Sequence, residues 1–138
     1  MDAAAAAGAV IRCGGKRLNR PGWFYPPTVI TDITRDMAIF TEEVFGPVAS
    51  VYCAADIDEA IEIANASPFG LGSNAWTRDE AEISRFTDEI EAGQVFINGM
   101  TVSYPELPFG GIKRSWYGRE LSGHGIREFC NLKTVWVA

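Results

Sequence analysis

Histidine and cysteine are scarce in this 138-residue sequence, and neither occurs in a pattern typical of metal binding. His124 is the only histidine, and a lone histidine cannot build a zinc site, so no metal site is predicted. The three cysteines, Cys13, Cys53 and Cys130, are odd in number and widely spaced, which argues against a disulfide framework and a CxxC motif. We therefore expect reduced cysteines, buried as small hydrophobic residues, in a cytoplasmic protein.

Basic residues are also few, and long apolar runs are absent. The 12 Lys and Arg residues are outnumbered by 18 Asp and Glu residues, and the net charge of -6 disfavours a nucleic-acid partner, because such binding needs clustered cations. The short basic and aromatic patch at residues 114–119 is interpreted as a solvated loop. No apolar run approaches the roughly 20 residues that span a bilayer. The alanine run at residues 3–7 lacks the basic flank of a secretory signal, so no membrane association is expected.

The overall composition, 47% hydrophobic and 22% charged, is typical of a globular domain. Strands are predicted at residues 48–52, 72–76 and 94–98, and helical spacing of apolar residues predicts helices near 57–66 and 79–91. Asp56 with Glu59 three residues later fits a capping box, and Gly93 ends the second helix. Strands and helices that alternate through short connections predict an α/β fold with a parallel sheet.

The flanking segments carry weaker signals. The alanine-rich residues 1–12 are interpreted as the tail of a helix or a frayed end, and residues 14–30 as a loop followed by extended chain. Residues 101–122, rich in Gly, Pro and Ser, are predicted to form a long loop of the kind that is usually functional. The terminal TVWV string has strong β propensity and needs a partner strand. We therefore divide the chain into a domain of residues 1–122 and a C-terminal segment of residues 123–138.

Four strings follow one another along the chain: TEEVFGPVASV, FGLGSNAWT, GQVFINGM and LPFGGIKRSWYGRE. Together they resemble the aldehyde dehydrogenase superfamily, in its C-terminal part, from about residue 14 onward. The last string and the residues after it are most similar to succinate-semialdehyde dehydrogenases. The resemblance implies the parallel βαβαβ core of the catalytic domain and a C-terminal oligomerisation strand, hence a homo-oligomer. It also implies a small-molecule aldehyde as substrate and NAD or NADP as cofactor.

The resemblance implies a cofactor contact for two residues of the EEVFGPV motif. The second glutamate, Glu43, corresponds to the residue that accepts hydrogen bonds from the ribose on the nicotinamide side, and Phe45 to the residue that packs beside the nicotinamide ring. An ionised carboxylate can accept both hydroxyl hydrogen bonds and so fix the orientation of the ring. Without the resemblance, Glu42 and Glu43 would be interpreted as solvated surface carboxylates and Phe45 as a core residue.

The resemblance also places residues 101–111 at the substrate entrance. Ser103 stands six residues before Phe109 and corresponds to a serine that binds the distal carboxylate in succinate-semialdehyde dehydrogenases, and a hydroxyl donor suits that role. Asn98 lies at the carboxyl end of the third predicted strand, and ligand sites of parallel sheets are found at the carboxyl ends of strands. Asn98 could therefore contact a ligand, and the alternative is that it only caps the following loop. Trp116 stands where the family writes a small residue in GGxKxSGxGRE, so the indole is expected to be either strained, if φ is positive there, or displaced into solvent.

The family's nucleophile lies in a GQxC context and its general base in an ELGG context, and neither string is present. No catalytic residue is therefore assigned, and the chain alone is expected to be inactive. In the complete enzyme a thiolate attacks the aldehyde, hydride passes to the cofactor, and water with a glutamate base releases the acid. Two hypotheses remain: a portion of such a dehydrogenase, or a truncated, non-catalytic protein that acts only through strand-mediated association.

Overall fold

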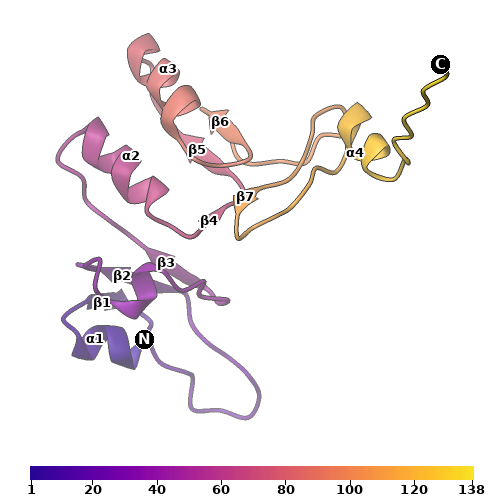
Figure 1. The fold of residues 1–138 in the computed structure, drawn as a ribbon. Helices are drawn as coiled ribbons and strands as arrows, with labels where there is room; N and C mark the ends of the chain where they lie inside the picture. The colour runs from indigo at the N-terminus through magenta and orange to yellow at the C-terminus, as the bar shows by residue number, and fades with distance from the viewer. The chain divides into compact units, whose positions relative to one another are not determined.

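The computed structural model describes all residues, 1–138, as two units, Met1–Ala55 and Asp56–Ala138 (Figure 1). Both units mix helices with small sheets, in agreement with the predicted α/β class. No helix is long and apolar enough to cross a bilayer. The elements of the first unit are α1 (Asp2–Ala6), β1 (Val10–Cys13), β2 (Thr28–Thr31), the 3-10 helix η1 (Ala38–Phe40) and β3 (Val48–Ser50).

The sheet of the first unit is mixed, with the strand order β1-β2-β3. β2 and β3 are parallel and pair Thr28 with Val48, whereas β1 runs antiparallel to β2. β1 was not predicted, because the alanine-rich start carries no strand signal. The strand forms after the chain turns at Gly8, whose φ of +111° is in the region that favours glycine.

The central strand β2 carries the core of the first unit. Thr28 and Ile30 are its buried residues, and the alternation of buried and half-buried positions places them on one face. The buried Thr28 hydroxyl is fully used, because it donates to the Pro26 carbonyl at 3.0 Å and accepts from the Gly15 amide at 2.8 Å. Around Ile30 lie the other buried residues of the cluster, Ala4, Ala9, Ile33, Met37 and Ile39.

The second unit contains the two predicted helices, and both are confirmed within one or two residues. α2 (Ile57–Asn65) begins after Asp56, whose carboxylate accepts from the Glu59 amide at 2.9 Å, as the capping box predicts. α3 (Glu80–Glu89) begins after Asp79, whose carboxylate accepts from the Ala81 amide at 2.8 Å. The other elements are β4 (Phe69–Gly70), β5 (Ser73–Ala75), β6 (Val95–Ile97), β7 (Ile112–Lys113) and α4 (Ser122–Glu128).

The second unit holds two separate two-stranded sheets rather than one extended sheet. β5 and β6 are parallel, pair Asn74 with Phe96, and are connected through α3, so they form one βαβ unit. β4 and β7 form an antiparallel pair. The continuous parallel βαβαβ core that was predicted is not observed, because β3 pairs with β2 in the first unit. Periodicity indicates which residues are strands but not which strands pair.

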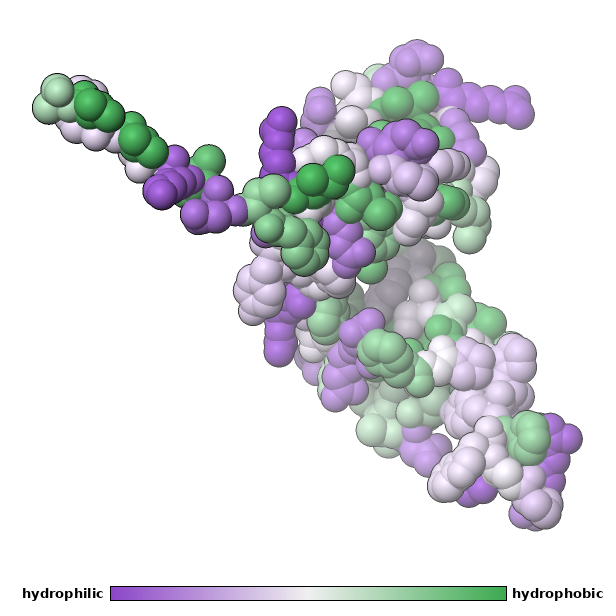
Figure 2. Space-filling model, turned by 90° about the vertical axis from the view of Figure 1, so that its right-hand side faces the viewer, coloured by the Kyte–Doolittle hydropathy of each residue, from purple (hydrophilic) through white to green (hydrophobic).

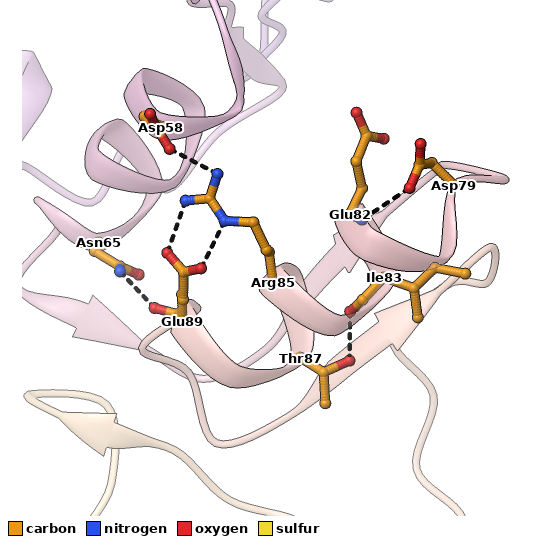
Figure 3. Close-up of polar contacts among 8 residues, drawn as sticks. All are labelled: Asp58, Asn65, Asp79, Glu82, Ile83, Arg85, Thr87 and Glu89. Atoms are coloured by element: carbon orange, nitrogen blue, oxygen red, sulfur yellow. Dashed lines mark hydrogen bonds and ion pairs between the residues drawn. The ribbon is translucent and has the colours of Figure 1, made fainter.

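Polar contacts join α2 and α3, as Figure 3 shows. Arg85 Nη1 lies 2.6 Å from Asp58 Oδ1, and Arg85 Nε lies 2.6 Å from Glu89 Oε1. The Asn65 side-chain amide donates to the Glu89 carbonyl at 2.7 Å. The same side chain accepts from the Glu91 backbone amide at 2.8 Å. Ile61 is the only buried hydrophobic side chain of this unit.

The end of the chain does not form the predicted strand. α4 covers Ser122–Glu128, and no helix or strand follows it. The apolar side chains there are exposed: Leu132 by 99%, Val135 by 73%, Trp136 by 87% and Val137 by 85%. Figure 2 shows green, hydrophobic residues along this projecting end. β propensity alone was not sufficient, because a strand needs hydrogen bonds from a neighbour and no strand of this chain pairs with it.

Candidate functional site

The segment that carries Glu43 and Phe45 is an irregular stretch, residues 41–47, between η1 and β3. Its start is held by the Glu42 amide, which donates to the Ala38 carbonyl at 3.0 Å. Its end is held by the Pro47 carbonyl, which accepts from the Thr28 amide at 2.8 Å at the start of β2. The two side chains of interest therefore stand on a short bridge between fixed points, at the amino end of β3.

Glu43 and Phe45 are both exposed, and neither contributes to the core. The Glu43 carboxylate has no hydrogen bond or ion pair within the chain and lines a cavity of about 250 Å³ against α1 and η1. Phe45 is 92% exposed and is not among the residues that line this cavity. A free carboxylate and a free aromatic face fit contacts to a ribose and a planar ring. The structure does not bring the two side chains into one pocket.

Gly46 lies in the turn that leads into β3. A Cβ on Gly46 would meet nothing closer than the Val48 side chain at 4.0 Å, and its φ is not positive. Neither close approach nor a special backbone conformation therefore explains glycine at this position. Its carbonyl accepts from the Val48 amide at 2.8 Å, so the residue helps the chain turn into β3.

Phe109 lines a cavity of about 400 Å³ in the second unit. Its backbone is fixed by a bridge to Glu120, with the Phe109 amide donating at 2.8 Å and the Phe109 carbonyl accepting at 2.6 Å. The other wall residues are mostly apolar: Gln94, Val95, Phe96, Ile97, Val102, Tyr104, Leu107 and Pro108. Ser103 is exposed and does not line this cavity, although the residues on either side of it do. The structure thus brings together Phe109 and β6 but leaves Ser103 outside.

The loop at residues 101–122 is held in shape by contacts that sequence reasoning missed. Arg119 Nη1 donates to the carbonyls of Gly111 and Gly118, each at 2.8 Å. Ser115 Oγ accepts from the Gly70 amide at 3.0 Å and ties the loop to β4. Arg119, which directly precedes the bridge partner Glu120, gave no local signal, because its acceptors are backbone carbonyls that only the folded loop brings close.

Trp116 is accommodated without backbone strain, because its φ is not positive. The indole is 40% exposed, and its Cδ1 lies 3.3 Å from where a Cβ of Gly110 would stand. It also lines an apolar cavity of about 680 Å³ together with Ile126 and Phe129 of the α4 region. The bulky residue therefore packs over a glycine and shapes the surface of the loop.

Asn98 fixes the end of β6 to the end of β5. Its side-chain Oδ1 accepts from the Thr77 amide at 3.0 Å, and its Nδ2 donates to the Thr77 carbonyl at 2.7 Å. Its φ of +56° is a conformation that asparagine tolerates better than most residues. Both ends of the amide are used by backbone, which supports the structural role over ligand contact.

The three cysteines are all exposed, which corrects the expectation that they are buried. Cys13 lies on β1, where three of the four residues are exposed, and Cys130 follows α4. The expectation was wrong because the average burial of cysteine says nothing about strand edges and chain ends. No group of histidine, cysteine and carboxylate side chains could hold a metal ion.

The chain is of the mixed α/β class and contains one βαβ unit. It also carries a loop with a free carboxylate and an exposed aromatic ring, and an apolar cavity beside a second loop. These features together are typical of a ligand-binding part of an α/β enzyme. The aldehyde dehydrogenase family profile matches residues 1–135, and the chain belongs to this family. It is 83% identical over 138 residues to succinate-semialdehyde dehydrogenase [NADP(+)] of Mycobacterium leprae, and 82% identical to succinate-semialdehyde dehydrogenase [NADP(+)] 1 of Mycobacterium tuberculosis H37Rv. Each alignment covers all 138 residues of this chain, and the chain spans 30% of the length of each relative.

Solved structures give the same family. The succinic semialdehyde dehydrogenase of Streptococcus pyogenes in complex with NADP+ superposes with a TM-score of 0.89 at 41% identity, over 99% of this chain and 30% of that one. Betaine aldehyde dehydrogenase of Staphylococcus aureus in complex with NAD+ superposes with a TM-score of 0.87 at 41% identity, over 94% of this chain and 26% of that one.

Proposed function

We propose that this chain is a portion of an NAD(P)-dependent aldehyde dehydrogenase that oxidises succinate semialdehyde to the dicarboxylic acid. The observation that carries the proposal is the identity of 82 to 83% over the whole chain with enzymes named for that reaction. Because the chain spans 30% of those relatives, the remaining parts of the site would come from sequence outside these 138 residues. The nucleophile and general base belong to that remainder, since no cysteine here has the GQxC context.

Glu43 and Phe45 are the residues that we assign to the cofactor. When bound, the nicotinamide accepts the hydride that leaves the substrate carbon. The unpartnered carboxylate of Glu43 is free to accept hydrogen bonds from both ribose hydroxyls, and the exposed ring of Phe45 is free to limit how far the nicotinamide swings. Hydride transfer depends on such positioning, so these contacts would affect its rate rather than its chemistry.

Phe109 and Ser103 are the residues that we assign to the substrate entrance. Phe109 and its neighbours give the 400 Å³ cavity an apolar wall, which suits the methylene groups of a short aldehyde. Ser103 lies outside that wall in an exposed segment, where its hydroxyl is free to donate to a distal carboxylate. The two residues would then contact opposite ends of one substrate.

A graft tests the proposal. The matched 138-residue portion of the Mycobacterium tuberculosis relative is replaced by this chain, and reduction of NADP+ is followed with succinate semialdehyde. We expect the chimaera to keep activity, with the unmodified relative as reference and the isolated chain as an inactive control. A chimaera that folds and binds NADP+ but does not oxidise the aldehyde would contradict the proposal.

The exposed apolar end supports a second candidate function, association without catalysis. Four apolar side chains between residues 132 and 137 are at least 73% exposed, and the peptide groups there have no strand partner. Pairing with a neighbouring edge strand would satisfy both. Sedimentation of the chain and of a Val135→Glu, Val137→Glu variant distinguishes the cases: association that survives the double substitution does not use this segment.

A further inference from the structure

The side-chain amide of Gln94 has a buried donor that the chain itself does not pair. Gln94 directly precedes β6 and lines the cavity of about 400 Å³ that Phe109 also lines. Its Nε2 atom is buried and has no hydrogen-bond partner within the chain. A donor that is shielded from water and unpaired is costly, so folded proteins keep few of them. The Nε2 atom therefore points to a partner that is not one of these 138 residues.

The backbone at Gln94 is held from two directions. The Ser73 amide and Ser73 Oγ both donate to the Gln94 carbonyl, at 2.9 Å and 3.2 Å, and tie it to β5. On the other side, Gly93 packs so closely that a Cβ there would lie 2.7 Å from Gly111 Cα. Gly93 precedes Gln94, and Gly111 follows Phe109 by two residues, so this contact brings Gln94 and Phe109 to one cavity. An amide on a fixed backbone loses less freedom when a ligand binds.

Apolar side chains form most of the wall around this amide. Tyr104 is the only other lining residue with a polar atom in its side chain, and no charged residue lines the cavity. Such an apolar wall with few polar groups is typical of ligand pockets, in which the polar groups fix the orientation of the ligand.

The chemistry of Nε2 limits which ligand atom it can meet. An amide nitrogen only donates, so its partner must be an acceptor. A hydrogen bond to a charged acceptor is stronger than one to a neutral acceptor, and no carboxylate lines the cavity to repel an anion. Gln94 therefore favours a ligand that carries a carboxylate.

The substrate of the proposed function has a carboxylate at one end, and this inference rests on that function. The aldehyde at the other end must reach the nucleophile, which we place outside these 138 residues, so the carboxylate is the end that this chain meets. Ser103, which we assign to that carboxylate, stands between Val102 and Tyr104, and both of these line the cavity. A carboxylate offers about four acceptor sites, so it can accept from Gln94 and Ser103 together.

We propose that Gln94 determines substrate specificity by donating a hydrogen bond from Nε2 to the distal carboxylate of the aldehyde. The class that it selects is aldehydes that end in a carboxylate, in preference to unsubstituted aldehydes of the same length. An unsubstituted aldehyde leaves the donor unpaired, and a site built to hydrogen-bond a substrate rejects an analogue that lacks the group. Because Gln94 does not meet the reacting carbon, its contribution is to binding and appears in KM.

The test compares two aldehydes in the graft with the Mycobacterium tuberculosis relative. Gln94→Met removes the donor and keeps a side chain of similar length. Butanal has the four carbons of succinate semialdehyde but no carboxylate. We expect the ratio of kcat/KM for succinate semialdehyde to that for butanal to fall by about tenfold or more, mainly through a higher KM for succinate semialdehyde. Asn19→Leu, which removes an exposed amide of the first unit, is the matched control and should leave the ratio unchanged.

A second variant tests the charge of the ligand group. Gln94→Glu keeps the shape of the side chain but adds a negative charge, so it should lower the ratio further than Gln94→Met, because like charges repel. If the amide instead pairs with another part of the complete enzyme, both variants should lower kcat/KM for the two aldehydes alike, together with the melting temperature. A constant ratio in an active graft overturns this inference alone. A folded graft that binds NADP+ but oxidises neither aldehyde overturns the proposed function and this inference with it.

Discussion

Arg85 of α3 binds Asp58 of α2 with Nη1 2.6 Å from Oδ1, and the same guanidinium binds Glu89 on its own helix through Nε and Nη2. One side chain therefore joins the two helices and also supports an i, i+4 pair within α3. The pair lies at the surface, because Asp58 is 76% exposed. Few buried apolar contacts accompany this ion pair, since Ile61 is the only buried hydrophobic side chain in the second unit.

Replacing Arg85 with Met should lower the thermal stability of the second unit by a few degrees. The change removes the link to Asp58 and leaves two carboxylates near each other on α2 and α3. The difference from the wild type should shrink at high salt, because surface ion pairs are screened. Arg114→Met is the control, since Arg114 is exposed and has no ion pair. A melting difference that does not depend on salt would show that the Arg85 side chain acts through packing.

The acid sensitivity of the same contact follows from Glu89. Hydrogen bonding from Arg85 lowers the pKa of the Glu89 carboxyl below its usual value. A lowered pKa in the folded state means that the stabilisation is present above the unfolded pKa and is lost as pH falls through the folded pKa. Glu89→Gln should therefore reduce stability at neutral pH and make melting temperature less dependent on pH in the acid range. Parallel melting curves for wild type and variant at all pH values would contradict this.

Gly93 should tolerate no side chain. A Cβ there would collide with the Gly110 carbonyl oxygen and lie 2.7 Å from Gly111 Cα, both of them backbone atoms that cannot move aside cheaply. Gly93→Ala should destabilise the second unit by about 3 kcal/mol, in the upper range for overpacking. Gly99→Ala is the matched control, because its nearest neighbour would be 3.9 Å away. Chemical denaturation of both variants measures the difference, and equal stabilities would refute the packing argument.

The elements that could be predicted are those whose signals are local. Capping residues and apolar spacing determined α2 and α3, because a helix forms its hydrogen bonds within itself. Strand β1 and the coil at the chain end could not be predicted, since pairing depends on a distant partner. For the candidate site, the motifs indicate the segments of Glu43 and Phe109, and the roles of these two residues stay predictions. The exclusion of Ser103 from the cavity and the anchoring of the loop by Arg119 depend on tertiary contacts.

The sharpest test of the proposed cofactor contact compares two adjacent carboxylates in the grafted enzyme. Glu42 and Glu43 are both exposed, but the motif assigns ribose binding to Glu43. Glu43→Gln removes the charge from the acceptor while keeping its shape. The activation free energy of hydride transfer should rise by about 1 to 2 kcal/mol, the scale of a charged hydrogen bond, which slows the step roughly tenfold. Glu42→Gln should leave the rate unchanged.

The measurement is single-turnover reduction of NADP+ by each graft, with binding of NADP+ titrated separately. If Glu43 fixes the ring, the rate at saturating cofactor falls, because misorientation persists after binding is complete. If Glu43 contributed only to affinity, saturation would restore the rate and the role in orientation would be wrong. If both the Glu42 and the Glu43 variant reacted as fast as the unmodified graft, both residues would be surface carboxylates, because charge lost at either position would have no effect on the reacting centre.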